Sequence, residues 1–170
     1  DMDKYSLEQI NALPKEFLLL LINRAKKYLK NNDVWKKICE ENDESVDIID
    51  YIPTMFGDLD VSAKTDHGIV ILNYKLLCEG NFYENYSYLI HEYCHWFQQC
   101  YGTEPTQGSD DGEYLDNPHE KEGFQNQIEF ISDEFGENEA EEYVDDLLSY
   151  HEVTNKKEKD KRKDELMAKV

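Results

Sequence analysis

The sequence has little positive charge, few prolines and glycines, and no long apolar run. Its 170 residues include 18 Lys and Arg against 38 Asp and Glu, a formal net charge of −20. A nucleic-acid binder needs a basic footprint for the phosphates, so we expect no nucleic acid as a partner. The same charge argues against anionic membrane surfaces, and no run reaches transmembrane length, so we expect no membrane partner.

Paired cysteine spacing is also missing. The four cysteines, Cys39, Cys78, Cys94 and Cys100, form no C-x-x-C motif. The start of the chain has no apolar segment after a basic stretch, which is the pattern of a signal peptide. We therefore expect reduced thiols and a cytoplasmic location.

The charge is unevenly distributed along the chain. Residues 155–170 contain seven Lys or Arg and four Asp or Glu, a charge of +3, so the remaining 154 residues carry −23. Beyond residue 151 the composition predicts a charged tail, 152–170, that is a frayed helix or disordered. We hypothesise that this basic tail lies against the acidic body of the protein.

The periodicity of the apolar residues changes near residue 59, from a helical pattern to a strand pattern. Helical patterns fill residues 1–57, and then Leu59, Val61 and Ala63 alternate with polar residues, which predicts a strand. A turn at 65–68 leads to the β-branched run 69–73, a second strand of a hairpin. His67 in this turn is interpreted as a surface residue.

These patterns predict an α+β fold, mostly helical, with a small hairpin or sheet edge beside a central helix. At 39% hydrophobic residues, the chain can bury one core. We expect a single domain over residues 1–151: a helical part at 1–57, a catalytic core at 58–136 and a C-terminal helix at 137–151. A mobile loop is expected at 102–112.

The central helix carries His91-Glu92-Tyr93-Cys94-His95, a His-Glu-x-x-His motif, among bulky apolar residues. The spacing of four residues places the two imidazoles one turn apart on one face, where they can share an ion. Two histidines and a glutamate inside an apolar helix are costly without a partner such as a cation. The motif therefore predicts a Zn²⁺ site with His91 and His95 as ligands, and a hydrolase.

Zinc in a catalytic site takes a third protein ligand and leaves one position for water. The continuation His-x-x-Gly-x-x-His is excluded, because Gln98 and Tyr101 occupy its last two positions. Together with the later stretch from Asn117 to Phe124, the motif resembles the gluzincin type of zinc metallopeptidase. It is similar in style to small bacterial and phage peptidases of the ImmA/IrrE-like groups. The resemblance covers roughly residues 59–135.

The resemblance implies a minimal zincin-like fold in which Glu120 is the third zinc ligand. Many gluzincins carry this ligand as Glu-x-x-Ala, and here Glu120 and Gly123 stand at the ends of that pattern. Helical periodicity places Glu120 on the inward stripe with Phe124, whereas Glu122 shares a solvated stripe with Asn126. Glu122 is the alternative ligand. A capping box with Asn117 is the structural alternative for Glu120.

The motif also predicts a mechanism, with Glu92 as the general base that takes a proton from water during hydrolysis of a peptide bond. The expected partner is a protein or peptide substrate, held in part by a strand edge. Candidate oxyanion donors are Tyr114, His119 and His151, and Gln127 is a candidate to support a metal ligand. The alternative function is a non-catalytic zinc-binding protein-interaction module.

Overall fold

The computed structural model describes residues 6–78, 81–102 and 111–170. Most of the predicted loop at 102–112 therefore lies outside the described residues. The chain divides into two compact units, Asp1–Thr103 and Glu104–Val170, and this boundary falls inside the range predicted as one domain. Among the described helices, none has the length and apolar character needed to cross a bilayer.

The first unit is a helical layer around a small sheet, which confirms the mostly helical α+β class. The side chains of Ser6 and Asn32 cap α1 and α3, because each accepts a hydrogen bond from the first turn of its helix. Its helices are α1 (Leu7–Ala12), α2 (Lys15–Leu29), α3 (Asp33–Glu41) and α4 (Tyr86–Tyr101), with 3₁₀ turns η1 (Val46–Tyr51), η2 (Tyr74–Leu77) and η3 (Phe82–Asn85).

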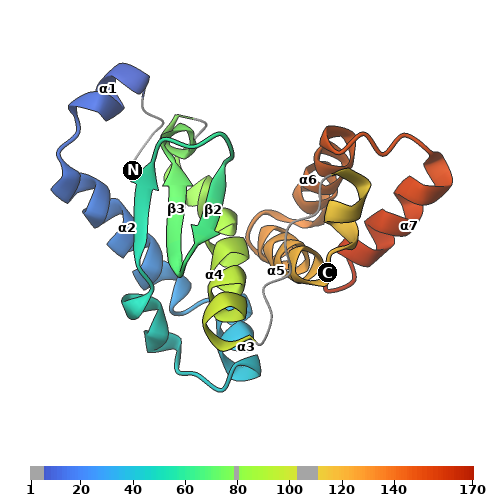
Figure 1. The fold of residues 1–170 in the computed structure, drawn as a ribbon, viewed down its shortest axis with the longest axis horizontal. Coiled ribbons are helices and arrows are strands. Elements are labelled where there is room, and N and C mark those ends of the chain that lie inside the picture. The colour runs from blue at the N-terminus through green and yellow to red at the C-terminus, as the bar shows by residue number, and fades with distance from the viewer. Residues whose placement is uncertain (1–5, 79–80, 103–110) are drawn as a thin grey trace. The chain divides into compact units, whose positions relative to one another are not determined.

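Three short strands, β1 (Thr54–Gly57), β2 (Ala63–Asp66) and β3 (Ile69–Asn73), form a sheet in the order β1-β3-β2. The pair β2–β3 is the predicted antiparallel hairpin, and β1, which was not predicted, pairs in parallel with β3. The helices α2 and α4 pack against the sheet, α2 on β1 and α4 on β2 and β3 (Figure 1). The edge strand β2 thus lies beside the motif helix.

The predicted boundaries of the first hairpin strand were wrong. The strand begins at Ala63 and not at Leu59, and the turn contains only two residues, His67 (φ 50°) and Gly68 (φ 78°). Positive φ at both central positions is the geometry of a tight hairpin turn, and glycine adopts it without steric cost. Residues 59–61 instead form a loop, because the side-chain amide of Asn73 donates to the carbonyls of Leu59 and Val61, both at 2.9 Å.

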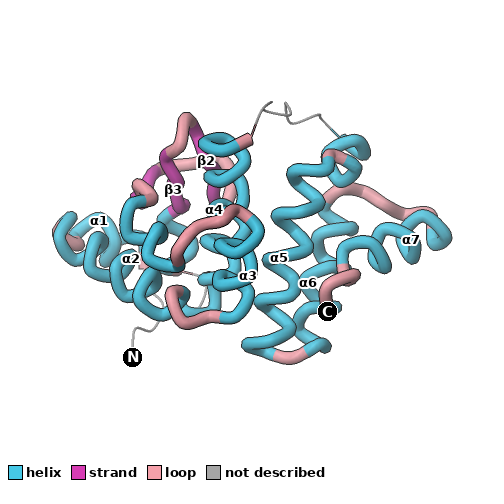
Figure 2. Tube along the Cα trace, turned by 90° about the horizontal axis from the view of Figure 1, so that it is seen from below, coloured by secondary structure: helices cyan, strands magenta, loops and turns pink. Residues whose placement is uncertain are grey.

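The second unit is entirely helical in its described part, with η4 (Asp111–Asp116), α5 (Pro118–Phe135), α6 (Glu137–Tyr150) and α7 (Lys156–Leu166). Asn117 caps α5, Pro118 takes its first position and Gly136 (φ 103°) ends it. The helices α5 and α6 run side by side (Figure 2). Their shared core consists of Leu115, Phe124, Ile128, Ile131, Ala140, Val144, Leu148 and Leu166.

The sequence led us to expect a frayed or disordered C-terminal segment, and this prediction was wrong. Its residues form α7, which packs on α5 and α6 and buries Leu166 to 2% exposure. Composition alone missed this helix, because a single buried leucine in a charged segment gives almost no apolar periodicity.

Candidate metal centre

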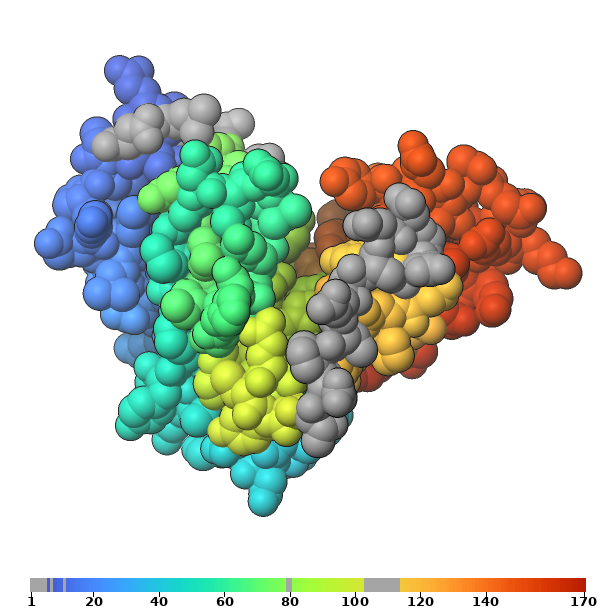
Figure 3. Space-filling view, in the orientation of Figure 1, coloured from blue at the N-terminus to red at the C-terminus, as the bar shows by residue number. Residues whose placement is uncertain are grey.

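The motif helix α4 is buried on most of its surface. Leu89, Ile90, Tyr93, Cys94 and Phe97 are all buried, and so are His91 (5% exposed) and Glu92 (6% exposed). The predicted buried helix is therefore confirmed. In the space-filling view, the sheet (teal to green) and the later turns of α4 (yellow-green) lie on one face of the first unit (Figure 3).

The two histidine side chains converge as the spacing predicted. Nε2 of His91 and Nε2 of His95 lie 3.1 Å apart, and the rings are inclined at 71°. Two Zn–N bonds of about 2.0–2.1 Å at a tetrahedral angle would place the nitrogens about 3.3 Å apart. The pair therefore fits the spacing that a shared zinc ion requires. The same distance also permits an N–H···N hydrogen bond between the rings.

Gln98 determines which nitrogen of His95 can bind a metal. Oε1 of Gln98 lies 2.6 Å from Nδ1 of His95, one turn further along α4. A carbonyl oxygen only accepts, so Nδ1 carries the proton and Nε2 of the neutral ring presents its lone pair. This is the tautomer that a ligating Nε2 needs. The motif gives no signal for this partner.

Glu92 is held from the sheet by Thr65 of strand β2. The hydroxyl of Thr65 lies 2.9 Å from Oε1 of Glu92 and 3.0 Å from its main-chain carbonyl, and it can donate to either. A carboxylate with this degree of burial needs such donors, because water cannot solvate it fully. Thr65 lies 27 residues before Glu92, so no local spacing in the sequence could reveal the contact.

The hairpin is fastened to α4 by a second pair of bonds. The side chain of Gln99 donates to the carbonyl of Thr65 at 2.9 Å and accepts from the amide of Gly68 at 3.1 Å. Both the main chain and the side chain of Thr65 are therefore fixed against the motif helix. This arrangement limits how far Thr65 can move away from Glu92.

A polar network in the core fixes the opposite side of α4. The hydroxyl of Tyr93 lies 3.0 Å from Oγ1 of Thr54, which in turn donates to the carbonyl of Ile52. Lys26 donates to the same carbonyl at 2.7 Å. Burial raises the pKa of Tyr93, with a smaller opposing effect of Thr54, so the phenol stays neutral. The network joins α2, β1 and α4.

The predicted third ligand lies in the second unit, in the first turn of α5. This residue is Glu120. The main-chain amide of Glu120 lies 3.5 Å from the capping oxygen of Asn117, and that of His119 lies 2.9 Å from it. The Glu120 side chain is half-buried, whereas Glu122 is exposed, as the periodicity predicted. The role of Glu120 as a metal ligand stays a prediction.

Two of the three candidate oxyanion donors gather near Glu120 within the second unit. The rings of Tyr114 and His151 stack with centroids 5.1 Å apart at 20°. Burial lowers the pKa of His151, and the nearby Glu120 carboxylate partly opposes this effect. His119 is half-buried in the first turn of α5. Their role as donors stays a prediction.

Two polar residues in the middle of α5, Asn126 and Gln127, are buried. Gln127 is 1% exposed, and its role in supporting a metal ligand stays a prediction. Asn126 was predicted on a solvated stripe, but it is fully buried and accepts a hydrogen bond from Lys169 at 2.9 Å. The chain after α7 supplies this partner, which the pattern of α5 alone could not indicate.

Comparison with models of known protein families, with curated proteins and with solved structures finds no match to this chain. Any functional assignment therefore depends on the residues of the site.

Proposed function

We propose that this protein is a zinc-dependent metallopeptidase that hydrolyses peptide bonds with Glu92 as general base. The observation that carries the proposal is the 3.1 Å separation of Nε2 of His91 and Nε2 of His95, on a helix that also presents Glu92. A structural zinc site has no need of this glutamate, because it closes its fourth position with a protein ligand.

The proposed zinc ligands are His91, His95 and Glu120. Gln98 supports the assignment of His95, since its oxygen holds the proton on Nδ1. Zinc, when bound, lowers the pKa of a water ligand towards neutrality and polarises the scissile carbonyl. Glu122 is the less favoured carboxylate, because it is exposed on α5.

Glu92 is proposed to move the proton. Its carboxylate takes one proton from the attacking water, so that the oxygen can add to the peptide carbonyl, and then gives the proton to the leaving amine. The hydroxyl of Thr65 orients the carboxylate by donating to Oε1. Oε2, to which Thr65 does not donate, is the oxygen proposed to take the proton.

An extended peptide is the substrate that the first unit suits best. Strand β2 is the edge of the sheet and is fastened to the motif helix through Thr65. A peptide added to such an edge gains main-chain hydrogen bonds without a deep specificity pocket. The net charge of −20 disfavours nucleic acid and anionic lipid. Cys39, Cys78, Cys94 and Cys100 form no disulfide bond, which suits a reducing compartment, so we propose that the protein acts in the cytoplasm.

A non-catalytic zinc-binding interaction module is the second candidate. In such a module, the hydrogen bond from Thr65 to Glu92 would serve only to hold α4 against strand β2. In a module of this kind, replacing Glu92 by an amide of the same shape would leave binding of the partner protein unchanged.

Metal content and turnover together test the proposal. We expect about one zinc per chain by mass spectrometry of the purified protein, and loss of zinc in the His91→Ala variant. Glu92→Gln should keep the zinc and lower cleavage of a peptide library by roughly 10²–10⁴-fold. Glu40→Gln, at an exposed site on α3, is the matched control. A Glu92→Gln protein that cleaves like the parent would exclude the peptidase mechanism.

A further inference from the structure

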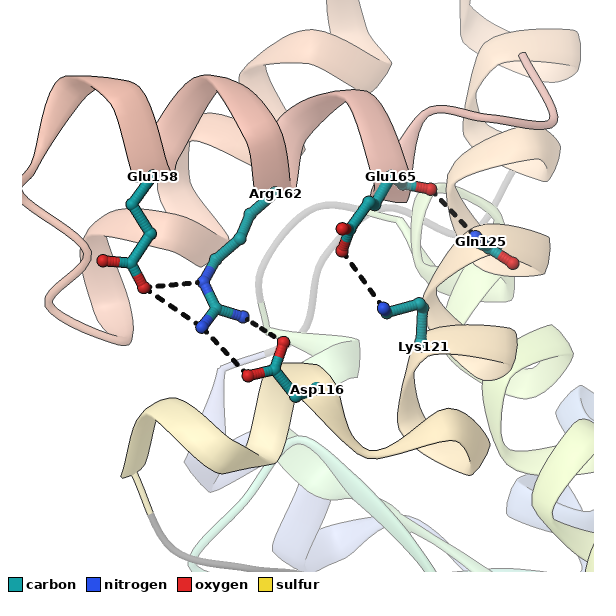
Figure 4. A network of polar contacts seen from close by, with 6 residues as sticks. All are labelled: Asp116, Lys121, Gln125, Glu158, Arg162 and Glu165. Atoms are coloured by element: carbon teal, nitrogen blue, oxygen red, sulfur yellow. Dashed lines mark hydrogen bonds and ion pairs between the residues drawn. The ribbon is translucent and has the colours of Figure 1, made fainter.

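The C-terminal helix α7 contacts the chain on both sides of Glu120. Arg162 makes two parallel hydrogen bonds to the carboxylate of Asp116, at 2.9 and 3.2 Å, and is bound on its other side by Glu158 (Figure 4). The Arg162 side chain is only 12% exposed. A two-pronged bond of this kind fixes the orientation of its partner as well as its distance.

Asp116 directly precedes the residue that caps α5. The Asn117 side chain accepts from the amides of His119 and Glu120, so the path of the chain into α5 determines where this first turn lies. A contact that fixes Asp116 therefore also fixes the turn that presents Glu120. Arg162 reaches this point from 46 residues further along the chain.

On the other side of Glu120, α7 holds the next turn of the same helix. Nζ of Lys121 pairs with the carboxylate of Glu165 at 3.1 Å, and the side chain of Gln125 donates to the main-chain carbonyl of Glu165 at 2.8 Å (Figure 4). Leu166 is buried in the core of the unit beside these contacts. The first two turns of α5 are thus held along one side by α7.

The charge of the second unit gives these contacts a physical reason. Residues 111–155 contain 15 Asp and Glu and one Lys, a formal charge of −14, whereas residues 156–170 carry seven Lys and Arg and four Asp and Glu, a charge of +3. Isolated exposed ion pairs contribute little, but a shielded arginine inside a network of several charges is the favourable case.

We propose that α7 is a latch that positions the zinc ligand Glu120, with Arg162 as its positioning residue. This inference depends on the proposed function, since it takes Glu120 as a ligand. The latch makes zinc affinity depend on a helix that supplies no ligand itself. Outer contacts that orient a metal ligand typically change metal affinity by roughly 10–100-fold when they are lost.

Four proteins test the latch: the parent, Arg162→Gln, Glu120→Ala and the double variant. Arg162→Gln should weaken zinc binding roughly tenfold in a competition titration with a chelating dye. In the Glu120→Ala background the same change should alter affinity by less than about twofold, because the ligand it positions is already absent. Lys161→Gln, which removes the same charge from the exposed neighbouring residue, should bind zinc like the parent.

Two further measurements separate positioning from simple destabilisation. The visible spectrum of the Co²⁺-loaded Arg162→Gln protein should shift towards that of Glu120→Ala, and Arg162→Lys should restore part of the parent spectrum. Without metal, amide hydrogen exchange in the first turn of α5 should speed up in Arg162→Gln and not in Lys161→Gln. If Arg162→Gln fails to fold, Asp116→Asn removes the same contact from the other side.

The outcomes distinguish the latch from the function it depends on. If Glu120→Ala binds zinc as tightly as the parent, Glu120 is not a ligand and the latch fails with it, whereas the peptidase mechanism is still decided by the turnover of Glu92→Gln. If Glu120→Ala weakens binding but Arg162→Gln does not, only the latch is wrong. An equal effect of Arg162→Gln in both backgrounds would also overturn the latch.

Discussion

Thr65 is the residue through which the sheet acts on the proposed chemistry. Glu92 is 6% exposed, and a general base in this position must keep one oxygen directed at the water while the other is held. The hydroxyl of Thr65 supplies that hold at 2.9 Å. The main chain of Thr65 is fixed independently by Gln99, so the side chain can be changed without releasing the hairpin.

Thr65→Val should therefore lower turnover with little effect on zinc content. A hydrogen bond to a charged group contributes about 1.5–3 kcal/mol, so its loss should reduce turnover by about tenfold or more. Thr65→Ser keeps the hydroxyl and should retain most of the activity. The check is turnover at saturating peptide, measured beside zinc content. Equal turnover in the valine and serine variants would remove Thr65 from the mechanism.

For individual residues, the sequence predicts contacts within one helix and misses contacts between different elements. His91 and His95 could be paired in advance, because four residues of helix place their side chains on one face. Thr65 could not be assigned to Glu92, since their contact depends on how the hairpin packs on α4. Asn126 was misplaced for the same reason, because its partner Lys169 lies 43 residues away.

Among the elements, the helix α5 and the hairpin β2–β3 were predictable from local patterns, whereas β1 and α7 were not. The helix α5 is indicated by its Asn-Pro start, its apolar stripe and its final glycine. The strand β1 has only the four residues Thr54–Gly57, and it pairs in parallel with a strand further along the chain. Four residues give no reliable alternation, so this strand depends on tertiary pairing.

The packing of α7 leads to a quantitative prediction about the stability of the second unit. Leu166 is 2% exposed in the core of the second unit, whereas Val170 is 45% exposed. Leu166→Ala should lower the free energy of unfolding of this unit by about 2–5 kcal/mol. Val170→Ala should change it by less than about 0.5 kcal/mol. Urea unfolding followed by circular dichroism compares the two, and equal stabilities would mean that α7 adds nothing to the core.

For the whole molecule, the division into two units decides how zinc should affect stability. Each unit buries its own apolar residues, so we expect each to unfold in its own transition. Of the proposed ligands, His91 and His95 belong to the residues Asp1–Thr103, and Glu120 belongs to Glu104–Val170. A ligand bound by residues of both units stabilises both, because unfolding of either one releases it.

Zinc should therefore raise both unfolding transitions of the parent protein. At a free zinc concentration of about 100 Kd, the gain is about 2.7 kcal/mol. Both tryptophans, Trp35 and Trp96, belong to the first unit, so their fluorescence follows that unit alone, while circular dichroism follows both. In Glu120→Ala, zinc should still raise the fluorescence transition, though less, and leave the other transition unchanged. If zinc stabilises only the first unit of the parent, its site lies wholly within residues 1–103, and another group must complete the coordination of His91 and His95.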